Sequence, residues 1–187
     1  MSEEIPDDAL MLLVARGDHA ACQELARRHL GRIVSFAQRT LGDRAAAEDV
    51  AQEVFTRLWV HAKRWQPGPA RLSTWLHRIA LNLCFDHAAR KREESMDDVP
   101  EPIDPSADAI TQLHDQQLRT HVGAAMQTLT PTQRAAITLC YFEGLRNLEA
   151  AEVLGVSVEA LESLLARARR ALRERLCEIA PELLGAD

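Results

Sequence analysis

A helical segment between residues 73 and 92 carries the side chains best suited to binding nucleic acid. Arg78, Asn82 and Phe85 are spaced by four and three residues, so they project from one side of a helix. Arg contacts phosphates, Asn pairs with a base edge, and an aromatic ring stacks on an unpaired base. The segment therefore predicts a face that binds DNA.

Two features flank this face. Trp75 opens the helix and the basic run Arg90-Lys91-Arg92 closes it. The preceding loop, which includes Pro67, Gly68, Pro69 and Arg71, could receive a base lifted from its stack, at an unstacking cost of a few kcal/mol. A tryptophan at such a position is more often a core anchor than a contact, and the basic run favours the DNA role.

A second polar stripe lies on the segment from Asp43 to Lys63. Asp49, Gln52, Glu53 and Thr56 recur at spacings of three, four and seven, opposite an apolar stripe of Ala47, Val50, Val54 and Leu58. An ordinary solvated face explains such a stripe. The alternative is a docking surface for a basic helix of a partner.

Residues 144–173 have the pattern of a helix-turn-helix. Ala150 and Ala151 are small enough for two helices to cross closely, Gly155 suits a left-handed turn, and Ser157 can cap the second helix. The second helix of this motif can enter a DNA major groove, whereas a purely structural hairpin is the alternative. Arg167, Arg169 and Arg170 are candidate phosphate contacts.

The sequence offers no catalytic arrangement. Its seven His are dispersed, its four Cys stand singly without a CxxC pair, and no Gly-rich loop follows a strand. We therefore expect no catalytic residue, no metal site, no cofactor and no small-molecule substrate, and we expect the cysteines to be buried free thiols.

The elements that position these residues are predicted to be helices throughout. The chain has 187 residues, 47% of them hydrophobic, and no alternating stretch of strand length. We expect an all-α protein of two small domains, residues 1–92 and 110–187, joined by a flexible acidic linker over residues 93–109. The linker holds three prolines among acidic residues and could bury little apolar surface.

Local signals predict several helix ends. Gly42 should end a helix whose apolar face consists of Leu25, Leu30, Ile33, Val34, Ala37 and Leu41. Asp43 should cap the next helix, Ser73 should cap a helix that starts at Thr74, and Thr130 followed by Pro131 should start another.

The charge distribution is uneven. The net charge is −6, yet residues 71–92 hold five Arg or Lys and one acid, whereas residues 93–115 hold eight acids and no Arg or Lys. Attraction to DNA would be local and weak for the isolated chain, so a larger partner should hold it there. An acidic, polar start and the lack of a long apolar run indicate a cytoplasmic location.

Taken together, the motifs resemble the extracytoplasmic-function (ECF) sigma factors of the sigma-70 family over nearly the whole chain. The resemblance rests on AEDVAQEVFTRLW from Ala47, STWLHRIALNLCFDHAARKR from Ser73, and LTPTQRAAITLCYFEGL from Leu129, which leads into the helix-turn-helix. It implies two helical domains, sigma-70 region 2 and region 4, and a role in promoter-specific initiation by core RNA polymerase.

The resemblance also implies roles for residues. Asp49, Gln52 and Glu53 fall where such factors bind the β′ clamp helices, and the second domain should meet the β flap. Residues 67–72 fall where a flipped base of the minus-ten element is captured, and Arg71, Trp75, Arg78, Asn82 and residues 90–92 fall on or beside the helix that melts and reads it. The recognition helix for the minus-thirty-five element should use Ser157, Glu159, Glu162, Ser163, Arg167, Arg169 and Arg170. Control by an anti-sigma factor, often membrane-anchored, is also implied.

The recognition helix departs from the common pattern. Many family members have a basic residue, Ser and Arg where this chain has Glu162, Ser163 and Leu164. Glu could accept from a cytosine amine and Leu could touch a thymine methyl. A sigma mimic that binds an anti-sigma factor is thus one alternative, and a repressor that binds operator DNA alone is another, although the repressor would leave the first domain without a role.

Overall fold

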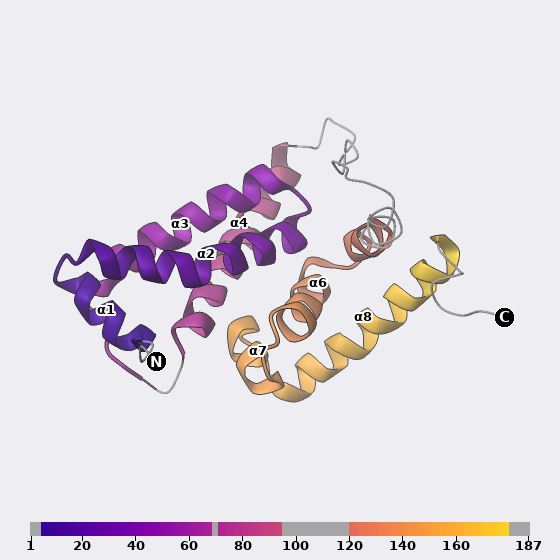
Figure 1. Ribbon diagram of the computed structural model, residues 1–187. Helices are drawn as coiled ribbons and strands as arrows, with labels where there is room; N and C mark the ends of the chain where they lie inside the picture. Colours follow the sequence, from indigo (N-terminus) through magenta and orange to yellow (C-terminus); the bar gives the residue numbers. More distant parts are fainter. Residues whose placement is uncertain (1–4, 69–70, 95–119, 180–187) are drawn as a thin grey trace, which may run out of the picture.

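The computed structural model describes residues 5–68, 71–94 and 120–179, and every regular element in these ranges is a helix, as predicted (Figure 1). The N-terminal half (residues 5–94) contains four helices: α1 (Asp7–Ala15), α2 (His19–Leu41), α3 (Arg44–Ala62) and α4 (Leu72–Glu94). The C-terminal half (residues 120–179) contains helical residues 120–127, then α6 (Pro131–Ile137), η2 (Thr138–Phe142), α7 (Asn147–Leu154) and α8 (Val158–Ile179). Element η2 is a π-helical turn that directly continues α6. The predicted linker lies outside the described residues from residue 95 onward.

The predicted helix ends depend on local hydrogen bonds. Gly42 takes the left-handed conformation, at φ 75°, and ends α2. The Asp43 carboxylate accepts from the N–H of Ala46 at 3.1 Å and caps α3. Thr130 and Gln133 form a reciprocal capping box at the start of α6. These ends were predictable because each one needs only residues within one helical turn.

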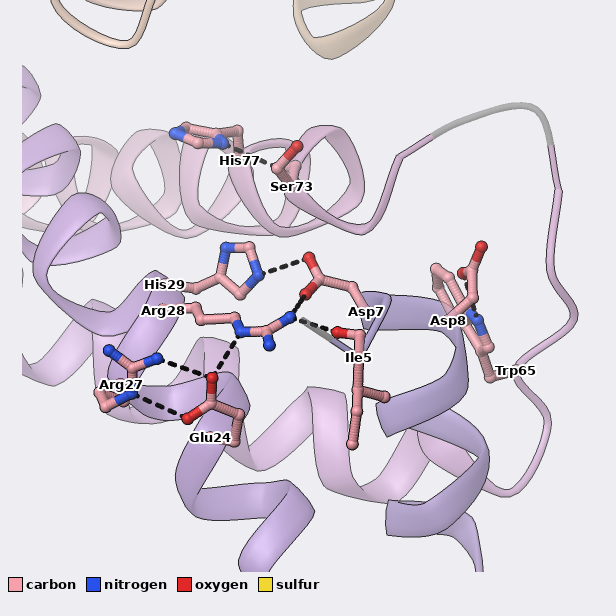
Figure 2. Close-up of polar contacts among 10 residues, drawn as sticks. All are labelled: Ile5, Asp7, Asp8, Glu24, Arg27, Arg28, His29, Trp65, Ser73 and His77. Carbon is pink, nitrogen blue, oxygen red and sulfur yellow. Dashed lines mark hydrogen bonds and ion pairs between the residues drawn. The ribbon is translucent and has the colours of Figure 1, made fainter. Parts of the chain in front are cut away.

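The predicted cap at Ser73 is wrong. Helix α4 begins at Leu72, so Ser73 lies in its first turn. The N–H of Trp75 donates to the carbonyl of Arg71 at 3.2 Å, which extends the helix toward the N-terminus. The Ser73 carbonyl lies 2.7 Å from Nδ1 of His77, one turn further along (Figure 2).

The core of the N-terminal half lies between α2, α3 and α4. Phe36 and Ile33 are fully buried on α2, whereas Leu30, predicted for the same face, is 43% exposed. The reason is that the buried side of α2 is centred on His29, Ile33 and Phe36, and Leu30 lies at its edge. From α3 and α4 the core receives Val54, Leu58, Leu76, Ala80 and Cys84.

Polar contacts fasten α1 to the rest of this half (Figure 2). The Asp7 carboxylate accepts from Arg28 at 2.9 Å and lies 2.8 Å from Nε2 of His29. The neighbouring Asp8 accepts from the indole N–H of Trp65 at 3.0 Å. Helix α1 is therefore attached both to α2 and to the loop that precedes α4. In the described residues no helix has the length and apolar character needed to cross a bilayer.

The four cysteines are free thiols, as predicted, but the expectation that all of them are buried is wrong, because only Cys84 is buried. Cys84 is buried in the core on α4, and burial raises the pKa of its thiol to about 12. Burial also raises the pKa of Cys22 and Cys140, which are partly buried. Cys177 is exposed near the end of α8.

This difference predicts an order of thiol labelling. At pH 8 a disulfide reagent should modify Cys177 first, Cys22 and Cys140 more slowly, and Cys84 only after unfolding, because the thiolate is the reactive form. Timed labelling followed by peptide mass spectrometry measures the order. A Cys177→Ser variant should lose only the fast phase, and rapid modification of Cys84 in the native protein would contradict its burial.

Candidate nucleic-acid interface

The predicted helix-turn-helix is present, formed by α7 and α8. Gly155 ends α7 at φ 67°, and the Ser157 hydroxyl accepts from the N–H of Ala160 at 3.2 Å, which caps α8. Ala150 and Ala151 are buried where the helices meet. The turn forms as predicted because glycine, the hydroxyl cap and the small residues act locally.

One side of α8 anchors the helix, and the other faces solvent. Leu161, Leu165 and Ala168 are buried against the rest of the C-terminal half. The seven residues predicted to contact DNA are all exposed: Ser157, Glu159, Glu162, Ser163, Arg167, Arg169 and Arg170. They therefore lie on a surface that a DNA groove could reach.

Two of these side chains are held by neighbouring elements. The Glu162 carboxylate accepts from the Asn147 amide of α7 at 3.4 Å, and the Arg169 guanidinium donates to the Tyr141 hydroxyl of η2 at 3.3 Å. Asn147 is the first residue of α7. The contact orients Glu162 and leaves its second carboxylate oxygen as an acceptor for a base amine.

Helix α4 presents Arg78 and Asn82 to solvent, as predicted, and Arg71 is exposed just before the helix begins. Phe85, predicted to project with them, is half-buried and lines a hollow against Pro131 of α6. The exposed part of this face is therefore formed by Arg and Asn, which suits phosphate and base-edge contacts more than stacking.

Trp75 belongs to an aromatic cluster. Its ring stacks on His61 at a centroid distance of 5.0 Å and meets Trp65 edge to face at 5.8 Å. It is half-buried, so one part of the ring anchors the loop after α3 while another part reaches solvent. Both roles considered for this tryptophan are compatible with that position. Pro69 and Ala70, in the predicted base-capture loop, lie outside the described residues.

Three basic residues, Arg90, Lys91 and Arg92, are exposed at the end of α4. The Lys91 ammonium lies 3.6 Å from the Asp43 carboxylate, which caps α3. Lys91 and Arg92 line a cavity of about 440 Å³ between α4, α2 and α6. The basic run thus lies where the two halves meet.

Helix α3 carries the predicted polar stripe on its outer side. Asp49 and Gln52 are exposed, and Glu53 is half-buried. Trp59 and Val60, 47% and 75% exposed, extend the stripe toward the end of the helix. This apolar end was not predicted, although Trp59 follows Gln52 by seven residues and Val60 follows Thr56 by four, spacings that place them on the same side of a helix. A surface with acidic, amide and exposed apolar groups suits a protein partner.

Within the described ranges, no three His, Cys, Asp or Glu side chains gather closely enough to hold a metal ion.

Comparisons with known proteins agree with this arrangement. The model of Sigma-70 region 2 matches residues 25–94, and that of Sigma-70 region 4 matches residues 121–172. The chain is 37% identical to the ECF RNA polymerase sigma factor SigE of Mycolicibacterium smegmatis, over 90% of this chain and 67% of SigE. It is 32% identical to SigG of Mycobacterium tuberculosis, over 84% of this chain and 48% of SigG.

A solved structure has a similar fold. The sigma factor RpoE of Bartonella quintana, crystallised with the anti-sigma factor NepR, superposes with a TM-score of 0.67 at 26% identity. The superposition covers 82% of this chain and 95% of that one. The likeness therefore extends over both helical halves.

Proposed function

The chain belongs to the ECF RNA polymerase sigma factors of the sigma-70 family, and we propose that it directs core RNA polymerase to a defined set of promoters. The observation that supports this most directly is that Sigma-70 region 2 precedes Sigma-70 region 4 in the chain, and that each region presents exposed residues suited to binding polymerase or DNA. In this proposal residues 1–92 bind polymerase and the minus-ten element, and residues 110–187 bind the minus-thirty-five element. Residues 93–109 form the linker between these two domains. The chemistry of RNA synthesis belongs to the polymerase.

The α3 stripe is the proposed polymerase surface. Asp49, Gln52 and Glu53 would meet the basic side of the β′ clamp helices, and the exposed apolar pair Trp59 and Val60 would add buried area at the same contact. The C-terminal half would meet the β flap.

Helix α4 is the proposed minus-ten surface. Arg71, Arg78 and residues 90–92 would contact phosphates, Asn82 would pair with a base edge, and Trp75 would border the site of a flipped base. These groups are exposed or half-exposed, so they need no rearrangement of the helix to reach DNA.

Helix α8 is the proposed minus-thirty-five surface. Glu162, oriented by Asn147, would accept from a cytosine amine, and Leu164 would touch a thymine methyl. Ser157, Glu159 and Ser163 lie beside them, and Arg167, Arg169 and Arg170 would contact phosphates.

Control by an anti-sigma factor follows from the same family membership, since RpoE is solved with one. Such a partner would cover the polymerase surfaces of a cytoplasmic sigma factor. A sigma mimic that only titrates an anti-sigma factor remains the second candidate, favoured by Glu162 and Leu164. The exposed Arg78 and Asn82 oppose it, because a mimic has no use for them.

Run-off transcription tests the proposed function. Core polymerase with this protein should give discrete new transcripts from genomic fragments, and their start sites would define both promoter elements. Binding to core or to an anti-sigma factor without any transcript would favour the mimic. Failure to bind either core or an anti-sigma factor would exclude both candidates and leave a repressor that binds operator DNA alone.

Replacing Gln52 and Glu53 with Ala should weaken binding to core polymerase by about tenfold, since residues at the centre of an interface carry most of its binding energy. Fluorescence-polarisation titration measures the affinity. Gln23→Ala removes an equally exposed amide from α2 and should change nothing. Wild-type affinity in the double variant would remove the stripe from the polymerase interface.

Asn82→Ala should leave core binding intact and reduce promoter opening by roughly tenfold, because a lost base-edge contact costs about 1–3 kcal/mol. A permanganate footprint of unpaired thymines reports opening. Since the Asn82 side chain is exposed, the melting temperature of the variant should equal that of the wild type. An unchanged footprint would remove Asn82 from the melting role, and a lowered melting temperature would indicate a structural one.

A further inference from the structure

Helix α1 carries an acid, Asp8, that the proposed function does not use. Its carboxylate accepts from the indole N–H of Trp65 at 3.0 Å, although 57 positions separate the two residues in the chain (Figure 2). Both side chains are half-buried. An ionised carboxylate only accepts hydrogen bonds, and such a bond is stronger than one between neutral groups. The contact therefore ties α1 to the segment that follows α3.

Helix α1 is itself held in a fixed position. Met11 is fully buried in the core of the N-terminal half. Asp7, the residue before Asp8, lies 2.9 Å from the Arg28 guanidinium and 2.8 Å from Nε2 of His29, both on α2. Asp8 thus stands on a helix whose place is set by the core and by two basic groups of α2.

Trp65 lies where the chain leaves α3. The helix ends at Ala62, and the backbone N–H of Trp65 donates to the Ala62 carbonyl at 3.1 Å. The next three residues, 66–68, are all exposed. Trp65 is therefore the last half-buried residue before this exposed stretch, and the bond to Asp8 fixes the direction of its ring.

Trp65 in turn contacts Trp75 of α4. The two rings meet edge to face, with centroids 5.8 Å apart, and His61 stacks on Trp75 at 5.0 Å while meeting Trp65 at 6.2 Å. Aromatic pairs prefer such offset and edge-to-face geometries, so the three rings restrict one another. Trp75 precedes Arg78 by three residues and Asn82 by seven, which places it on the same side of α4. The orientation of Trp75 is thus part of the proposed minus-ten surface.

We propose that Asp8 is a positioning residue for the minus-ten surface, and that it acts through Trp65 to hold the Trp75 ring in the orientation that borders a flipped base. The proposal rests on the proposed function for the role of that surface. Asp8 does not itself touch DNA. A base that packs against a ring already held in place binds at a smaller entropic cost, because the ring has no freedom left to lose.

Three variants isolate the contact. Asp8→Ala removes the acceptor, Trp65→Phe removes the indole N–H and keeps an aromatic ring, and Asp8→Asn keeps an acceptor oxygen without the charge. Glu48→Gln is the control, because it removes a negative charge from an exposed side chain of α3 that pairs only within that helix. Loss of an acid alone favours attraction to DNA, so slower promoter opening by Asp8→Ala cannot result from charge.

The first readout needs no polymerase. In the ¹⁵N-labelled full-length protein, the three indole N–H signals can be assigned by replacing each tryptophan with Phe. Asp8→Ala should shift the signals of Trp65 and Trp75 and leave that of Trp59, on the outer face of α3, in place. An unmoved Trp75 signal would overturn the proposal, because Asp8 would then have no influence on that ring.

The second readout is promoter opening by core polymerase with each variant. Asp8→Ala and Trp65→Phe should open the promoter about fivefold more slowly, at the lower end of what loss of one base–aromatic stack costs, and Asp8→Asn should stay within about twofold of the wild type. Affinity for core should not change. On a template with an abasic site at the unpaired minus-ten position most important to the wild type, all variants should open equally, because no base remains to be placed.

Three results would overturn the proposal. One is wild-type opening by both Asp8→Ala and Trp65→Phe. Another is the same fivefold loss on the abasic template, which would show that the contact only stabilises the domain. The third is a double variant whose loss is the product of the two single losses, because residues that act as a unit lose their effect once.

Folding and the proposed function are checked separately. Circular dichroism and the melting temperature show whether each variant is folded, and Trp65→Phe carries the test if Asp8→Ala does not fold. If the wild type opens no promoter, the proposed function fails, and the indole signals alone decide whether Asp8 orients Trp75.

Discussion

The structure depends on one helix, α4, which packs against three other helices, α2, α3 and α7. Leu76, Ala80 and Cys84 are buried in the core with α2 and α3. Because 3.6 residues make a turn, that burial fixes the direction in which Arg78 and Asn82 point, which is outward. The remaining side of α4 receives α7. Core packing, the candidate promoter surface and the contact between the halves are therefore coupled through the rotation of a single helix about its axis.

How far the sequence predicts this structure depends on the range of each interaction. The caps at Asp43 and Thr130 and the turn at Gly155 were predictable, because each needs only neighbours in the chain. Leu30 was assigned wrongly because tertiary packing decides which residues at the edge of a helix face are buried. Ser73 was assigned wrongly because the helix begins one residue earlier, at Leu72.

The candidate site shows the same division. Exposure of Asp49, Asn82 and the α8 residues followed from helical spacing, whereas the half-burial of Phe85 against Pro131 did not. The buried positions of Arg134 and Glu143 could not have been predicted, because their partners on α2 lie about a hundred residues away in the chain. The π-helical turn η2 was also missed, and it directly precedes Glu143. A local sequence pattern shows which residues share a helix face. It does not show which distant segment packs on that face, and the burial of Arg134 and Glu143 depends on that packing.

The three tryptophans all lie in the N-terminal half of the molecule. Trp59 lies on the outer face of α3, and Trp65 and Trp75 pack together beside the loop that precedes α4. The C-terminal half contains none. Tryptophan emission from this protein therefore originates wholly in the N-terminal half, next to the surfaces assigned to polymerase and to the minus-ten element. In an unlabelled sample, the wavelength and intensity of tryptophan fluorescence can therefore show when a partner binds to this half. Helix α8 contains no tryptophan and contributes nothing to that signal.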